Sequence, residues 1–100
     1  MGLYGFSSSA AKTFQTTINP ADIATVTLSV QTFTVNGLAT TDFIVINMPG
    51  LADDSGVKPV FARVSAANTL EISFYNFTGG SVNLGSHIVN ILVLGSGSTS

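Results

Sequence analysis

The clearest pattern in the sequence is an alternation of hydrophobic and polar residues with a period of two, which is typical of β-strands. In residues 25–35 the apolar side chains first fall on even positions and then, from Phe33 onward, on odd positions. A shift of one residue would turn every side chain of a strand to the opposite face. We therefore expect a β-bulge near Gln31 and Thr32, which would restore a single apolar face.

Turn signals divide the chain into short segments of this kind. Asn36-Gly37, Pro49-Gly50 and Gly79-Gly80 are typical of tight turns between strands. Residues 42–48 are apolar on both faces, which predicts an inner strand. Short strands at regular spacing predict an all-β fold, an antiparallel β-sandwich or small barrel (jelly-roll- or immunoglobulin-like) of six to eight short strands. The clearest strands are expected at residues 14–18, 25–35, 42–48, 60–64, 69–77 and 87–94.

The same alternation predicts which side chains form the core. Apolar residues that share one face of each strand should pack between two layers of the sandwich. The expected core consists of Val26, Leu28, Val30, Phe33, Val35, Phe43, Val45, Val64, Leu70, Ile72, Phe74, Val89, Ile91 and Val93.

The two ends of the chain differ from the middle in composition. Residues 1–12 mix small and aromatic side chains without a period, so we expect an N-terminal arm there. Residues 95–100 contain only Gly, Ser and Thr and are expected to form a flexible C-terminal tail. Residues 13–94 are expected to form a single β-sandwich domain.

The composition of the chain limits what it can bind. Only 8% of the residues are charged, against about 25% in an average soluble domain, and the net charge is −2. Three basic residues cannot provide the phosphate contacts of a nucleic-acid interface. The 45% hydrophobic content excludes a disordered chain. Few charges protect the surface and the sheet edges, so we expect much of the surface to be covered by partners.

The sequence offers little catalytic or metal-binding chemistry. There is no cysteine, and His87 is expected to be an ordinary residue at the start of a strand. Residues 53–56 resemble the beginning of a calcium loop but lack its later ligands, so a solvated loop is expected. We predict that the protein is not an enzyme and has no metal site and no cofactor.

Three further features have simple structural interpretations. Arg63 and Glu71 are expected to form an ion pair across neighbouring strands. Asn76 begins a glycosylation sequon, which we interpret as a chance match. The N-terminus does not have the pattern of a signal peptide, and the longest apolar run is too short to cross a bilayer. We therefore expect no membrane association.

Two blocks of the sequence resemble small virion structural proteins of tailed bacteriophages. The first is Thr32-Phe33-Thr34-Val35-Asn36-Gly37-Leu38 with Thr41-Asp42-Phe43-Ile44-Val45-Ile46-Asn47. The second is Phe61-Ala62-Arg63-Val64-Ser65-Ala66-Ala67-Asn68-Thr69-Leu70-Glu71-Ile72-Ser73-Phe74-Tyr75-Asn76. The resemblance covers about residues 25–94, and its most distinctive part is the Ala-Arg-Val-Ser-Ala-Ala run. The chain departs from the family pattern at Asn68, where Asp is usual.

This resemblance implies a β-sandwich module of a virus particle. A small chain without a stalk fits a capsid decoration (cement) protein best, which would bind the major capsid protein on the outside of the head and itself form a homotrimer. Such a protein would be made in the host cytoplasm and located on the capsid surface of the virion. The residues expected to contact partners are Leu3, Tyr4 and Phe6 on the arm, together with Tyr75 and Phe77.

Two alternatives remain open from the sequence. The first is a tail, neck or fibre-base component, because the resemblance implies a virion structural protein but does not indicate its position in the particle. The second is a carbohydrate- or receptor-binding module, with Tyr75, Asn76, Asp53 and Asp54 as its expected sugar platform.

Overall fold

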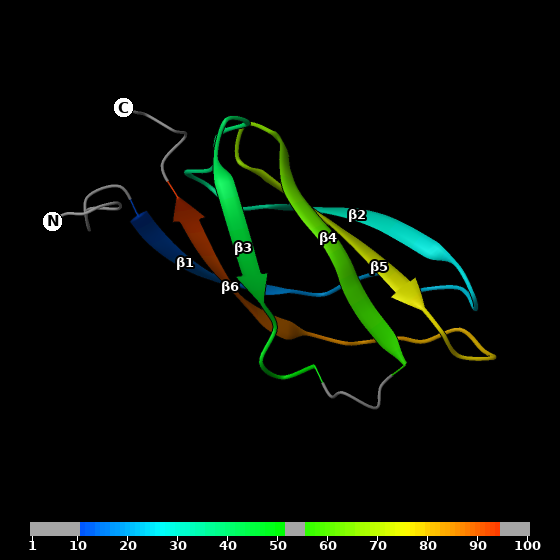
Figure 1. Cartoon of the computed structure of the whole chain (residues 1–100). Helices are drawn as coiled ribbons and strands as arrows, with labels where there is room; N and C mark the ends of the chain where they lie inside the picture. The colour runs from blue at the N-terminus through cyan, green and yellow to red at the C-terminus, as the bar shows by residue number, and fades with distance from the viewer. Residues whose placement is uncertain (1–10, 52–55, 95–100) are drawn as a thin grey trace, which may run out of the picture.

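The computed structural model describes residues 11–51 and 56–94, and all regular structure in these residues is β-strand (Figure 1). The strands pair antiparallel throughout. The predicted all-β class is therefore confirmed. The strands are β1 (Ala11–Ile18), β2 (Leu28–Thr34), β3 (Phe43–Asn47), β4 (Val57–Ala66), β5 (Thr69–Asn76) and β6 (His87–Leu94).

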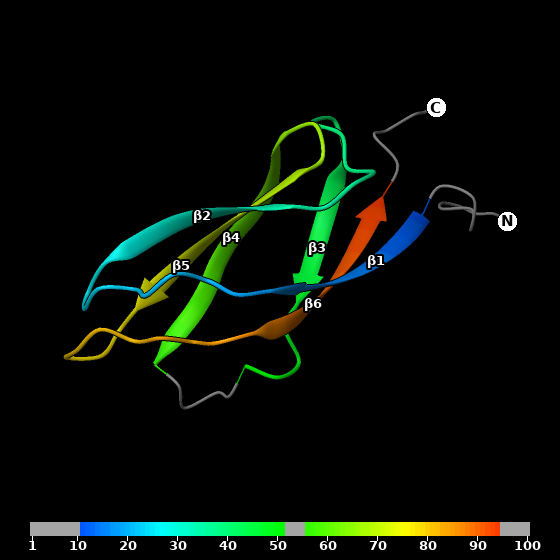
Figure 2. The same cartoon turned by 180° about the vertical axis from the view of Figure 1, so that it is seen from behind.

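The strands form two three-stranded sheets that pack face to face as a small sandwich (Figures 1 and 2). One sheet has the order β1-β6-β3 and the other has the order β2-β5-β4. The central strands are thus β6 and β5. Strand β3, which was expected to be an inner strand, lies at the edge of its sheet, so that prediction was wrong.

The core lies between β5 of one sheet and β6 of the other. Leu70, Ile72 and Phe74 of β5 are completely buried, as their alternation predicted. Phe33 is half-buried against this core. The residues predicted as core and found buried are Val35, Val64, Leu70, Ile72, Phe74, Val89, Ile91 and Val93.

The loops contribute core residues that the strand pattern does not reveal. Ile23 and Val82 form an isolated antiparallel bridge with backbone hydrogen bonds of 2.9 and 3.0 Å. This bridge ties the β1–β2 connection to the β5–β6 connection. Ile23, Leu38 and Met48 are the additional buried apolar residues of the loops, and Ile18 and Val57 are buried at the end of β1 and the start of β4.

The bulge expected near Gln31 and Thr32 is absent. Strand β2 pairs with β5 without interruption from Leu28 to Thr34, and the register shifts lie in β4 instead. Gln31 consequently points inward. Its amide donates to Ala21 O and accepts from Ala21 N at 3.1 and 2.8 Å, so the inward polar group is hydrogen-bonded. The continuous register leaves the apolar residues in the first half of β2 on the outer face.

Five residues expected in the core are exposed. Those in β2 and β3 lie on the outer faces of the two sheets, and Val26 lies in the turn before β2 with a positive φ of 48°. In β3 the alternation grouped the residues of each face correctly but did not show which face is inside. In β2 the absent bulge places Leu28 and Val30 on the face opposite to Phe33. The misplaced residues are Val26, Leu28, Val30, Phe43 and Val45.

Strand β1 begins earlier than expected. Ala11 pairs with Leu94 and Lys12 pairs with Val93, so these two residues belong to the sheet and not to the predicted arm. The rest of the arm, residues 1–10, and the tail, residues 95–100, lie outside the described residues.

Candidate binding surfaces

The outer face of the β2-β5-β4 sheet carries an apolar surface. Val30, Ser73 and Phe61 form one row across the three strands, and Val30 and Phe61 are 55% and 58% exposed. Ser73 points to the same face but is only 6% exposed, because these two larger side chains flank it. We call Leu28, Val30, Phe61, Tyr75 and Phe77 the apolar outer face of this sheet, and Lys58, the register partner of Tyr75 on β4, lies at its edge.

The aromatic residues at one end of this face pack against each other. The rings of Tyr75 and Phe77 have centroids 4.6 Å apart and meet at 62°, an edge-on arrangement. Tyr75 lies opposite Leu28 in the register, and Phe77 is 64% exposed. The two residues predicted to contact partners therefore lie together beside the exposed apolar side chains.

An ion pair forms the other margin of the apolar outer face. Arg63 Nε donates to Glu71 Oε2 at 2.9 Å, which confirms the predicted cross-strand pair. The hydrogen bond to Glu71 and the attraction of its carboxylate raise the pKa of Arg63. Arg63 is exposed, so water weakens this attraction, and the pair neutralises its own charges at the margin.

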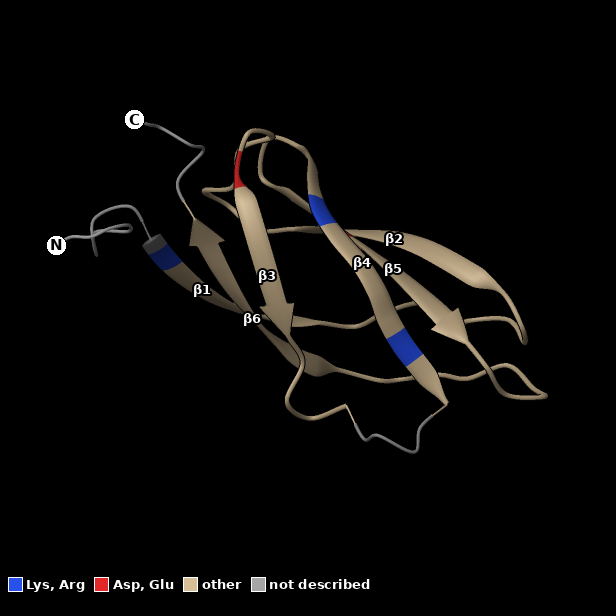
Figure 3. Ribbon diagram, viewed as in Figure 1, with Lys and Arg blue, Asp and Glu red and all other residues tan. Residues whose placement is uncertain are grey.

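Charges are scarce on the remaining strands of the described chain (Figure 3). The sequences of β2, β3 and β6 contain no Lys, Arg, Asp or Glu. Charged side chains are a common protection of sheet edges against pairing with other chains. Two of the four edge strands, β2 and β3, lack that protection.

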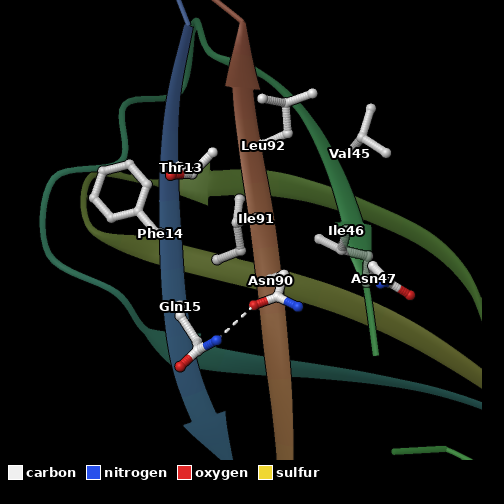
Figure 4. Close-up of a pocket in the computed structure, with 9 residues that line it drawn as sticks. All are labelled: Thr13, Phe14, Gln15, Val45, Ile46, Asn47, Asn90, Ile91 and Leu92. Carbon is white, nitrogen blue, oxygen red and sulfur yellow. Dashed lines mark hydrogen bonds between the residues drawn. The ribbon is translucent and has the colours of Figure 1, made fainter. Parts of the chain in front are cut away.

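The outer face of the β1-β6-β3 sheet is hollowed. An open cavity of about 510 Å³ is lined by residues of these three strands (Figure 4). Phe14, Ile46 and Ile91 pack toward the core, and the other six lining side chains alternate with them and point to the outer face. The cavity volume is in the range of small-molecule sites. Its lining residues are Thr13, Phe14, Gln15, Val45, Ile46, Asn47, Asn90, Ile91 and Leu92.

Three amide side chains cross the hollow in one row. Gln15 and Asn47 are the register partners of Asn90 on either side of it. Gln15 Nε2 donates to Asn90 Oδ1 at 2.9 Å, and Figure 4 shows the Asn90 Nδ2 on the opposite side, toward β3. Leu92 and Val45 lie in the neighbouring row, so a row of amide groups lies beside these apolar side chains in the hollow.

Asn76 is not available at the surface. It is fully buried, and its Nδ2 donates to Ile23 O and Gly80 O at 2.9 and 2.8 Å. Its Oδ1 accepts from Thr78 N and Thr78 Oγ1. These bonds hold the loop after β5 to the Ile23 bridge, so the sequon residue has a structural role. Asn76 therefore cannot take part in the predicted sugar platform, and Asp53 and Asp54 lie outside the described residues.

His87 is the first residue of β6, and its Nε2 lies 2.9 Å from Leu84 O, which confirms a strand-end histidine. Among residues 11–51 and 56–94, no three His, Cys, Asp or Glu side chains come together as metal ligands would. The predicted contact residues Leu3, Tyr4 and Phe6 lie outside the described part of the chain.

The amide row was missed from the sequence. Gln15 and Asn90 are 75 positions apart, and no local pattern marks either residue. Their alignment follows from strand pairing across β6, which a single sequence does not specify. The isolated polar position of Asn90 within the apolar run of β6 was the one available signal.

Comparison with known proteins finds no family model, no curated protein and no solved structure that matches the chain. The described residues contain no helix long and apolar enough to cross a membrane.

Proposed function

We propose that this chain is a capsid decoration protein of a tailed bacteriophage, which binds the outside of the head and stabilises the shell by bridging capsid subunits. The observation that supports the proposal most is the apolar outer face of the β2-β5-β4 sheet. The resemblance of residues 25–94 to virion structural proteins points in the same direction.

The chemistry of the apolar outer face suits a protein partner. The cores of protein interfaces are depleted of charge and enriched in aromatic residues. Val30 and Phe61 form the centre of this face, and the Tyr75–Phe77 pair lies at one end. The ion pair of Arg63 with Glu71 lies at its margin, where it resembles the polar rim of an interface.

The mechanism requires no covalent chemistry. A protein that binds the assembled shell but not the separated subunits stabilises the shell by mass action. A copy whose apolar outer face spans the seam between two capsid subunits binds only where the seam exists. Each bound copy then raises the free energy needed to open the seam.

We also propose that the chain associates with itself as a homotrimer on the capsid surface. Identical subunits usually associate with closed symmetry. Strands β2 and β3 are edge strands without charged residues, and charged residues are a usual protection of an edge against pairing with a second copy. The major capsid protein and further copies of this chain are then its partners.

A binding assay with matched variants tests the proposal. Heads purified from particles that lack this chain are incubated with the purified protein, and the bound fraction is measured by co-sedimentation. Leu28→Thr with Val30→Thr removes apolar surface from β2 while retaining residues that suit a strand. We expect this variant to bind at least tenfold more weakly, equivalent to about 1.4 kcal/mol.

The control carries the same kind of change on the other sheet. Phe43→Thr with Val45→Thr alters exposed apolar residues of β3, outside the apolar outer face. This control should bind heads as tightly as the unmodified protein. If the β3 variant loses binding and the β2 variant does not, the assignment of the docking face is wrong. If the unmodified protein does not bind heads, the proposed function is wrong.

A further inference from the structure

We infer that the hollow on the outer face of the β1-β6-β3 sheet is a binding site for a neutral carbohydrate. The inference goes beyond the proposed function and does not depend on it. In a two-layer sandwich the outer faces of the sheets point in opposite directions. The hollow therefore stays accessible when the apolar outer face of the β2-β5-β4 sheet is covered.

The polar groups of the hollow match sugar hydroxyls. Each amide side chain offers two N–H donors and a carbonyl acceptor, and a hydroxyl group both donates and accepts. Asn90 Oδ1 accepts from Gln15 Nε2, which fixes the orientation of both amides. The Asn90 Nδ2 lies on the side toward β3, where Asn47 is the register partner of Asn90 (Figure 4).

The apolar groups of the hollow match the C–H faces of a sugar ring. Leu92 and Val45 form the row beside the amides, and both are exposed. Binding sites for small molecules combine an apolar lining with a few placed polar groups. The volume of about 510 Å³ lies within the range of such sites.

The hollow does not suit charged ligands or extended peptides. None of its nine lining residues is charged. A peptide that adds to a sheet requires an unpaired strand edge. The hollow lies over β6, whose backbone is paired on both sides, to β1 and to β3. Side chains are therefore the groups that can recognise a ligand at this position.

The experiment measures binding at the amides directly. The full-length ¹⁵N-labelled protein is titrated with glucose, galactose, mannose and N-acetylglucosamine, and the side-chain amide signals are followed by NMR. We expect saturable shifts of Gln15, Asn47 and Asn90 with at least one sugar. The buried amide of Asn76 serves as the internal control and should not move.

Variants test whether the amides cause the binding. Asn90→Ala should weaken the affinity for the bound sugar tenfold or more. Asn47→Ala makes the same test at an exposed edge position, where the substitution leaves the fold intact. Thr17→Ala is the matched control, because Thr17 lies on the same face of β1 outside the hollow and should leave the affinity unchanged.

Three results would overturn the inference. The first is the absence of saturable shifts with all four sugars. The second is an affinity that is unchanged in both Asn47→Ala and folded Asn90→Ala. The third is a response to tetraglycine or glucuronate as strong as the response to the neutral sugars, which would indicate a peptide or anion site. Loss of head binding alone would not affect the inference, because the two surfaces are separate.

Discussion

The backbone N–H of Gly37 donates a hydrogen bond of 2.8 Å to the side-chain Oδ1 of Asn68, so the β2–β3 turn is fastened to the β4–β5 hairpin. Two backbone bonds strengthen the connection: Asn68 N donates to Leu38 O at 2.8 Å, and Val35 N donates to Asn68 O at 2.9 Å. Asn68 has a positive φ of 59°, which Asn and Gly tolerate better than most residues. A single turn residue thus fastens the β4–β5 hairpin to the connection that leads from one sheet to the other.

Substitutions at Asn68 should separate the effect of its positive φ from the effect of its side-chain hydrogen bond to Gly37 N. Asn68→Gly keeps the backbone conformation but loses the side-chain bond, so we expect a loss of about 1 kcal/mol in unfolding free energy. Asn68→Ala also introduces a strained φ, and we expect a loss of about 2 kcal/mol. Asn68→Asp retains an acceptor oxygen and should be close to the unmodified protein. Urea unfolding checks this order, and an Ala variant as stable as the Asp variant would contradict it.

Phe74 and Phe43 provide a test of the two-layer core. Phe74 is completely buried in β5, whereas Phe43 is 72% exposed in β3. Phe74→Ala should reduce the unfolding free energy by about 3–5 kcal/mol, enough to unfold a marginal small domain. Phe43→Ala should change it by less than about 0.5 kcal/mol. Similar losses for the two variants in chemical denaturation would show that the assignment of inner and outer faces is wrong.

The sequence was sufficient to predict the six strands and the core face of β5, but β1 and β4 are longer than predicted and β2 is shorter. In β5, large apolar residues alternate with smaller or polar ones, so its apolar face is unambiguous. In β2 the phase of the pattern changes, and local sequence cannot decide which half faces the core. Gln31 points inward because hydrogen bonds to the backbone of Ala21 satisfy its amide, a contact between segments outside the strand itself.

The candidate sites depend even more on long-range pairing. Tyr75 and Phe77 were named from the sequence as residues expected to contact partners, and they lie at the end of β5 and directly after it. Their exposed neighbours Leu28 and Val30 were assigned to the core, so the apolar outer face was not predicted. The amide row was not predicted because Gln15, Asn47 and Asn90 meet only through the register of three strands.

The N-terminal residues offer a test that is independent of the described surfaces. Residues 1–10 include Leu3, Tyr4 and Phe6, and ten extended residues span about 33 Å, enough to contact a neighbouring subunit. We expect their deletion to leave the melting temperature nearly unchanged and to weaken head binding tenfold or more. The deletion ends at residue 10 because Ala11 pairs with Leu94.

Two outcomes would contradict this prediction in different ways. A truncated protein that binds heads as tightly as the full chain would show that the arm contributes nothing to attachment. A truncated protein with a clearly lower melting temperature, measured by calorimetry, would show that Leu3, Tyr4 and Phe6 stabilise the fold of their own chain.

The proposed homotrimer predicts a specific mass in solution. Light scattering at micromolar concentration should give three times the chain mass of 10.3 kDa. Replacing Val30 with Lys places a charge on the uncharged edge strand β2, and this variant should dissociate if β2 forms the trimer contact. A monomer mass for the unmodified protein would contradict a stable trimer in solution.

The stoichiometry of the chain in purified virions tests the proposed function most directly. The particles are separated by gel electrophoresis, and the band of this chain is quantified against the band of the major capsid protein. A decoration protein covers the whole shell, so we predict a molar amount comparable to that of the major capsid protein. A trace amount would indicate a neck, tail or fibre-base component instead, and a chain that is absent from the purified particles would contradict the account.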